Sequence, residues 1–123
     1  MMILEDGAAI RAALATMNPI ARESTQLLAH RLIEEPSLVE NEYRLGNEWG
    51  QACAISLARS GVDLERDSDK VERFIENHGE AVLSIALSIV MFLAREQERQ
   101  RKWGWVGKAA AVAVGVGLGV FFG

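Results

Sequence analysis

Cysteine, proline and basic charge are scarce in this chain of 123 residues, which has one cysteine, two prolines and a formal net charge of -4. The single cysteine, Cys53, has no second cysteine in the chain with which to form a disulfide, so an oxidising compartment is not required. The acidic balance leaves no general basic face of the kind that binds nucleic acid. We therefore expect no nucleic-acid partner and a reducing compartment.

The beginning of the sequence lacks the pattern of a signal peptide. Met1 to Leu4 are followed at once by Glu5 and Asp6, whereas a signal peptide begins with positive charge and continues into an apolar core. We therefore expect the N-terminal part to stay in the compartment where it is made.

Patterns typical of catalytic or metal sites are also missing. His30 with Glu34 and Glu35 supplies a histidine and a carboxylate one helical turn apart, but zinc sites need three or four ligands. Cys53 has no neighbouring base that would make it a nucleophile, and no glycine-rich loop for phosphate follows a strand. We expect no enzymatic activity, no cofactor and no metal.

What the sequence does contain is a series of helical segments separated by clear breaks, which predicts an all-α fold, a small helical bundle. Asp6 is suited to cap the first helix, Asn18-Pro19 to begin the second, and Ser37 with Glu40 to open the third as a capping box. Gly61 should end that third helix, and Gly79 should end or bend the fourth. The expected helices span about residues 7–17, 18–34, 37–60, 67–79 and 81–102.

The most apolar of these segments is Ala81 to Ala94, which only Ser84 and Ser88 interrupt. A run of about 14 apolar residues is short for a membrane span and is more typical of a buried core helix. We therefore expect it at the centre of the bundle. The two serines should bond to carbonyls four residues earlier or line a helix contact.

A row of small residues lies in the third segment, where Gly46, Gly50, Ala54 and Ala58 recur every four positions. Glycine inside a helix costs about 1 kcal/mol relative to alanine, so two of them usually have a packing reason. The explanation we prefer is a close crossing of two helices within the chain. The alternative is a contact between subunits anchored by Trp49, since tryptophan is enriched at binding hot spots.

Residues 103–123 form a hydrophobic tail that we separate from the helical domain of residues 1–102. Fifteen residues without a polar side chain follow Lys108. On a helix, residues four apart share a face, and rows of small residues are typical of helices that associate in lipid. The row in this tail consists of Gly107, Ala111, Gly115, Gly119 and Gly123.

The start of the tail favours a membrane interface. Trp103 and Trp105 suit the headgroup region, and Lys108 can extend its amine outward. Five basic against two acidic residues between positions 95 and 108 give a net charge of +3, which favours the cytoplasmic side for the helical domain. As a helix, residues 106–123 would be roughly 27 Å long, close to the lower limit for a bilayer core of about 30 Å.

Two other arrangements of the tail stay open. It could be buried in protein within a large assembly, or form a strand, because small and larger residues alternate strictly from Ala111 to Val120. We prefer the membrane because only an interface explains the tryptophans and the basic flank.

The sequence thus favours a non-enzymatic interaction or scaffold protein on the cytoplasmic face of a membrane, homo-oligomeric through its C-terminal glycine-rich helix. A structural subunit of a large assembly, such as a virion or a secretion apparatus, is the alternative. An oligomeric pore is the third hypothesis, weakened because the tail offers no polar lining.

Overall fold

The computed structural model describes residues 2–101 and 121–122, with only the backbone described for residues 99–101. The described residues are helical and contain no strand, so the all-α prediction is confirmed. The elements are α1 (Gly7–Thr16), α2 (Pro19–Glu34), the 3-10 helix η1 (Pro36–Glu40), α3 (Glu42–Arg59), α4 (Ser68–Phe74), the π-helical turn η2 (Ile75–Gly79) and α5 (Glu80–Arg101).

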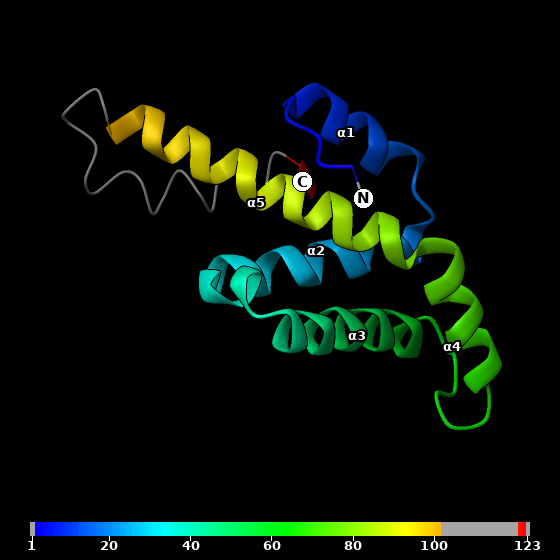
Figure 1. Cartoon of the computed structure of the whole chain (residues 1–123). Coiled ribbons are helices and arrows are strands. Elements are labelled where there is room, and N and C mark those ends of the chain that lie inside the picture. Colours follow the sequence, from blue (N-terminus) through cyan, green and yellow to red (C-terminus); the bar gives the residue numbers. More distant parts are fainter. Residues whose placement is uncertain (1, 102–120, 123) are drawn as a thin grey trace.

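The helices stack in three layers with α2 in the middle (Figure 1). One side of α2 packs against α5, which also carries α1, and the opposite side packs against α3. The apolar segment of α5 is buried as expected, with Val82, Ala86 and Ile89 fully enclosed. It is nevertheless α2 that occupies the central position predicted for that segment.

The composition of α2 explains this central position. Ala21, Ser24 and Ala29 are small and buried, so neighbouring helices can approach closely. The buried hydroxyl of Ser24 shares a hydrogen bond with that of Ser56 on α3. Each hydroxyl has a single proton, so one serine donates to the other, and the accepting serine donates to a backbone carbonyl of its own helix, that of Ile20 for Ser24 or of Ala52 for Ser56. Both buried hydroxyls therefore have a partner.

The predicted starts of the first two helices are confirmed, and that of the third is wrong. The carboxylate of Asp6 accepts from the Ala8 amide at 3.1 Å, and Asn18 accepts from Ile20 at 2.9 Å. Ser37 and Glu40 form no capping box, because Pro36 begins a 3-10 turn that continues through Glu40. The side chain of Asn41, on an extended backbone, caps α3 by accepting from the Arg44 amide at 3.1 Å.

The third predicted helix ends where expected, whereas the fourth bends at its predicted end and continues. The third helix ends at Arg59, and Gly61 follows with a φ of 98°, a left-handed conformation suited to glycine. Gly79 does not end a helix. The chain runs without a break from α4 through η2 into α5, and it bends where the π-helical turn widens the helix (Figure 1).

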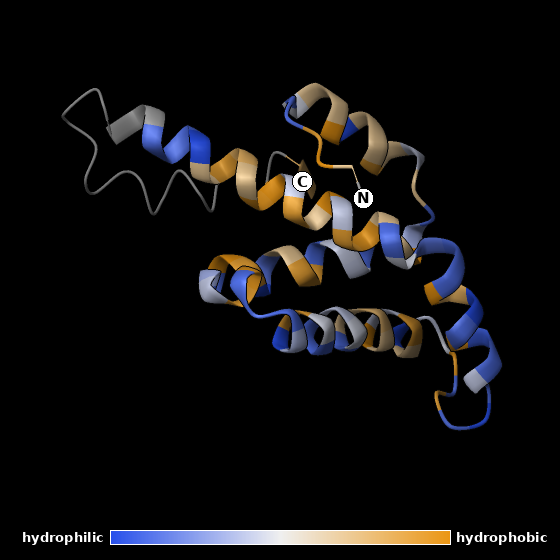
Figure 2. Ribbon diagram, viewed as in Figure 1, coloured by the Kyte–Doolittle hydropathy of each residue, from blue (hydrophilic) through white to orange (hydrophobic). Residues whose placement is uncertain are grey.

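Hydrophobic residues line the inner sides of the layers, and hydrophilic residues dominate α4 and the last described turns of α5 (Figure 2). Among the described residues, the helix Ser68–Glu98 alone is long and apolar enough to cross a membrane, with a mean hydropathy of 1.5 in its best window. Half of that window is buried inside the chain. This burial matches the expected core helix, and membrane crossing by this segment has only weak support.

Candidate functional site

Three charged side chains of α3, those of Arg44, Glu48 and Arg59, pair with residues of α2 or of the position directly after it. A guanidinium nitrogen of Arg44 lies 2.7 Å from a carboxylate oxygen of Glu35. Glu48 accepts two hydrogen bonds from Arg31 of α2, each at 3.1 Å. Near the other end of α3, Arg59 lies 3.0 Å from Glu23 of α2.

The side chains left on the outer face are small or neutral. Positions three and four apart share this face, and we call them the outer α3 face: Tyr43, Gly46, Asn47, Gly50, Ala54 and Ala58. Tyr43 is 80% exposed, and the other five are exposed or half-buried. The face therefore offers an uncharged surface along an 18-residue helix.

Gly46 and Gly50 do not serve a close crossing within the described chain, contrary to the explanation preferred from the sequence. A Cβ added at either glycine would meet no atom within 4 Å. The close approach occurs instead at Gly79, where an added Cβ would lie 2.8 Å from Cζ2 of Trp49. Trp49 thus packs inside the chain, on the side away from the outer α3 face, while the alternative of a subunit contact at this face stays a prediction.

A second feature is the N-terminal segment, which α5 holds through the serines noted in the sequence. The Leu4 amide donates to the Ser88 hydroxyl at 2.9 Å, and the Ser84 hydroxyl donates to the carbonyl of Met2. Ser88 also donates to the carbonyl of Ser84 at 2.7 Å. The expected bond to the carbonyl four residues earlier is confirmed for Ser88. The contact that both serines make is with the non-helical N-terminal segment and not with another helix. Sequence reasoning did not identify the segment that they bind.

The last described residues, Phe121 and Phe122, lie against the helical domain. Phe121 is only 5% exposed, and its ring meets that of Phe92 on α5 edge to face, with centroids 5.6 Å apart. Phe92 in turn packs over Gly7, where an added Cβ would lie 3.1 Å from the ring. Nothing in the sequence pattern had paired the end of the tail with α5.

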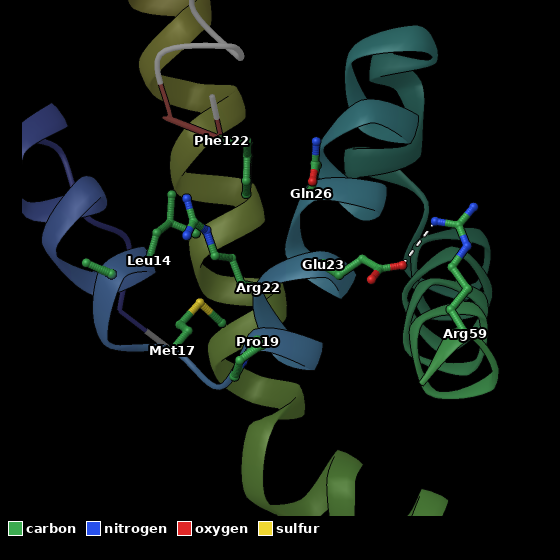
Figure 3. A pocket seen from close by; sticks show the side chains of 9 residues that line it. Leu14, Met17, Pro19, Arg22, Glu23, Gln26, Arg59 and Phe122 are labelled. Carbon is green, nitrogen blue, oxygen red and sulfur yellow. Dashed lines mark hydrogen bonds and ion pairs between the residues drawn. The ribbon is translucent and has the colours of Figure 1, made fainter. Parts of the chain in front are cut away.

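Phe122 lies at a groove of about 720 Å³ between α1, α2 and α3. Leu14, Met17 and Pro19 contribute the apolar part of the lining. Figure 3 shows Phe122 near Leu14 and Arg22, with the ion pair of Glu23 and Arg59 across the groove.

The remaining site predictions concern residues that the structure does not describe. The interface residues Trp103, Trp105 and Lys108 lie outside the described residues. So does the small-residue row of Gly107, Ala111, Gly115, Gly119 and Gly123. These assignments stay predictions.

Within residues 2–101 and 121–122, no group of three or more His, Cys, Asp or Glu side chains is placed to hold a metal ion. His30 and Glu34 line a groove of about 490 Å³ between α2 and α3 together with the Arg31–Glu48 pair. The carboxylates of this groove are thus engaged by an arginine. No known protein family, curated protein or solved structure matches this chain.

Proposed function

We propose that this protein is a non-enzymatic helical interaction protein, anchored by residues 103–123 at the cytoplasmic face of a membrane and associated with further copies of itself. The observation that carries the proposal is the uncharged outer α3 face, whose two glycines have open space in front of them. The anchor rests on the tryptophans, the basic flank and the apolar length of the tail.

The outer α3 face suits a second helix for a physical reason. Glycine at an exposed position inside a helix lowers stability by about 1 kcal/mol relative to alanine, and here nothing in the described chain compensates that cost. Without side chains at Gly46 and Gly50, another helix could approach the backbone closely along this row. Tyr43 and Ala54 would border such a contact without burying a charge.

Bulky substitutions test the self-association. Gly46→Leu with Gly50→Leu, and separately Gly115→Leu with Gly119→Leu, should reduce crosslinking yield and oligomer size, because each pair fills one small-residue row. Glu72→Leu, which adds the same side chain on the exposed surface of α4, is the matched control and should change neither quantity. Unchanged oligomers in both double variants would refute close packing through these rows.

Fractionation tests the anchor. The full-length chain and a chain that ends at Lys102 are separated into membrane and soluble fractions and washed with carbonate. We expect only the full-length chain to stay in the membrane pellet, because residues 103–123 supply the apolar anchor.

A structural subunit of a large assembly, with the tail buried in protein, is the second candidate. The specific observation in its favour is that Phe121 is buried against protein, on the ring of Phe92. In the fractionation experiment, this function requires the full-length chain to sediment as a defined large particle that carbonate releases from membranes.

A further inference from the structure

We propose that the helical domain carries a docking site for the chain's own Phe121 and Phe122, and that this docking competes with insertion of the tail into a bilayer. The docking part stands on the contacts of the described residues. The competition part rests on the proposed membrane anchor.

The site has an aromatic half on α5. The ring of Phe121 meets Phe92 edge to face, an arrangement that aromatic pairs favour. With 5% of its surface exposed, Phe121 is as enclosed as a core residue of the helical domain. A ring buried to this degree belongs to the packing of the domain.

The other half is the groove beside α1 and α2. Phe122 is half-buried there and shares the groove with Leu14, Met17 and Pro19. The two consecutive phenylalanines therefore make different contacts: Phe121 lies on Phe92, and Phe122 lies in the groove, where Figure 3 shows it.

Contacts that do not involve Phe121 or Phe122 hold the docking surface in place. Phe92 packs over Gly7 at the start of α1, where the absence of a side chain lets the ring approach the backbone. The neighbouring N-terminal segment is fixed by the bond from the Leu4 amide to Ser88. The site is therefore preorganised, which lowers the entropic cost of docking.

Docking and insertion exclude each other because each ring can be buried in only one place. A tail helix that begins near Val106 and crosses the bilayer would carry Phe121 on the order of 20 Å away from its start. The ring could not then remain on Phe92 in the helical domain. Whatever strengthens docking should therefore weaken insertion, because the two states compete for the same end of the chain.

A crosslink tests the docking. Met17→Cys with Phe122→Cys, in a full-length Cys53→Ala chain, places thiols at two positions that line the groove, and a short cleavable bis-maleimide joins them. We expect a crosslink within one chain, identified by mass. The control pair is Met91→Cys with Phe122→Cys, because Met91 is exposed on α5 and does not line the groove. Equal yields in both pairs, or a Met17–Phe122 crosslink only between chains, would overturn the docking site.

Flotation with anionic phospholipid vesicles then tests the competition. The crosslinked chain should bind at least about tenfold less than the same chain after the linker is cleaved, a change of about 1.4 kcal/mol. Equal binding of both forms overturns the competition. Failure of both forms to bind contradicts the membrane anchor, and the competition with it, while the crosslink still reports on the docking site.

A variant without a crosslink tests the competition by weakening the docking of Phe121 instead of enforcing it. Phe92→Leu keeps an apolar side chain over Gly7 but removes the aromatic partner of Phe121, so vesicle binding should rise severalfold. Leu83→Ala, at a half-buried position elsewhere on α5, controls for general destabilisation and should raise binding less. Unchanged or weaker binding of the Phe92→Leu chain, with its helical circular dichroism intact, would overturn the competition.

Discussion

Gly79 lies directly against the indole ring of Trp49, so that a Cβ added to Gly79 would stand 2.8 Å from Cζ2 of the ring. The glycine is the last residue of the π-helical turn, and the ring comes from α3. The indole Nε1 is buried and has no hydrogen-bond partner among the described residues. The missing side chain of Gly79 thus lets α3 support the bend between α4 and α5.

Gly79→Ala should therefore destabilise the protein although alanine is the better helix former. The added methyl group must displace a rigid ring, and overpacking of this kind costs about 1–3 kcal/mol. The helix-propensity gain of about 1 kcal/mol offsets only part of a cost near the upper end of that range. Urea denaturation of the full-length chain measures the difference in unfolding free energy.

Gly50→Ala is the matched control, because its added Cβ meets nothing within 4 Å. It should raise the free energy of unfolding by about 0.5–1 kcal/mol, the propensity gain without a clash. A Gly79→Ala chain as stable as the Gly50→Ala chain would show that the Trp49 ring moves aside at no cost.

The bond between the Leu4 amide and the Ser88 hydroxyl leads to a second prediction. Ser88→Ala removes the acceptor, so the free energy of unfolding should fall by about 1–2 kcal/mol, and the Leu4 amide should exchange with deuterium faster. Thr16→Ala is the control, because its exposed hydroxyl donates to the carbonyl of Ala13, a local contact within the same helix. Unchanged exchange at Leu4 in the Ser88→Ala chain would contradict the role of this bond.

Local signals in the sequence predicted the helices well, because they depend on residues close together in the chain. Asp6 and Asn18 cap α1 and α2 as expected. The start of α3 was predicted too early, since Ser37 and Glu40 have the residue types and the spacing of a capping box. Pro36 nevertheless begins a 3-10 turn, and Asn41, directly before Glu42, is the residue that caps α3.

Contacts between distant residues were harder to predict. Gly46, Gly50 and Gly79 all lie in predicted helical segments, so the sequence does not distinguish their roles. Only the packing of Trp49 shows that Gly79 is the glycine whose missing side chain permits a close contact within the chain. Likewise, the serines of α5 were identified as contact residues, but the partner of Ser88 is Leu4, 84 residues away along the chain, and that of Ser84 is Met2, 82 residues away. The same limit applies to Phe92 and Phe121, whose pairing depends on how the whole chain folds.

The ion-pair cluster between α2 and α3 predicts a loss of stability in acid. Hydrogen bonds from Arg44 lower the pKa of Glu35, and those from Arg31 lower the pKa of Glu48, both from an ordinary value of 4.5. A carboxylate whose pKa is lower in the folded state contributes stability that is complete above its unfolded pKa. That contribution is lost as the pH falls through the lower folded pKa.

The unfolding free energy should therefore stay level above the ordinary pKa and decline below about pH 4.5. Glu48→Gln should flatten the decline, because its carboxylate pairs with Arg31 across the two helices. Glu65→Gln, on the loop outside this cluster, is the control and should preserve the slope. Urea titrations at a series of pH values measure the slope of unfolding free energy against pH. Equal slopes in the native and Glu48→Gln chains would contradict the contribution assigned to the Glu48–Arg31 pair.

Cys53 provides a probe for the core that all these packing predictions share. Its side chain is fully buried on α3, and burial raises the pKa of its thiol, so the reactive thiolate is disfavoured. A thiol reagent should therefore label the native chain only through opening of the structure, on the order of 10³-fold or more slowly than the denatured chain. The Gly79→Ala chain should be labelled faster than the Gly50→Ala chain, in proportion to their difference in stability, if opening is global. Rapid labelling of the native chain would show that α3 separates from α2 independently of the rest of the fold.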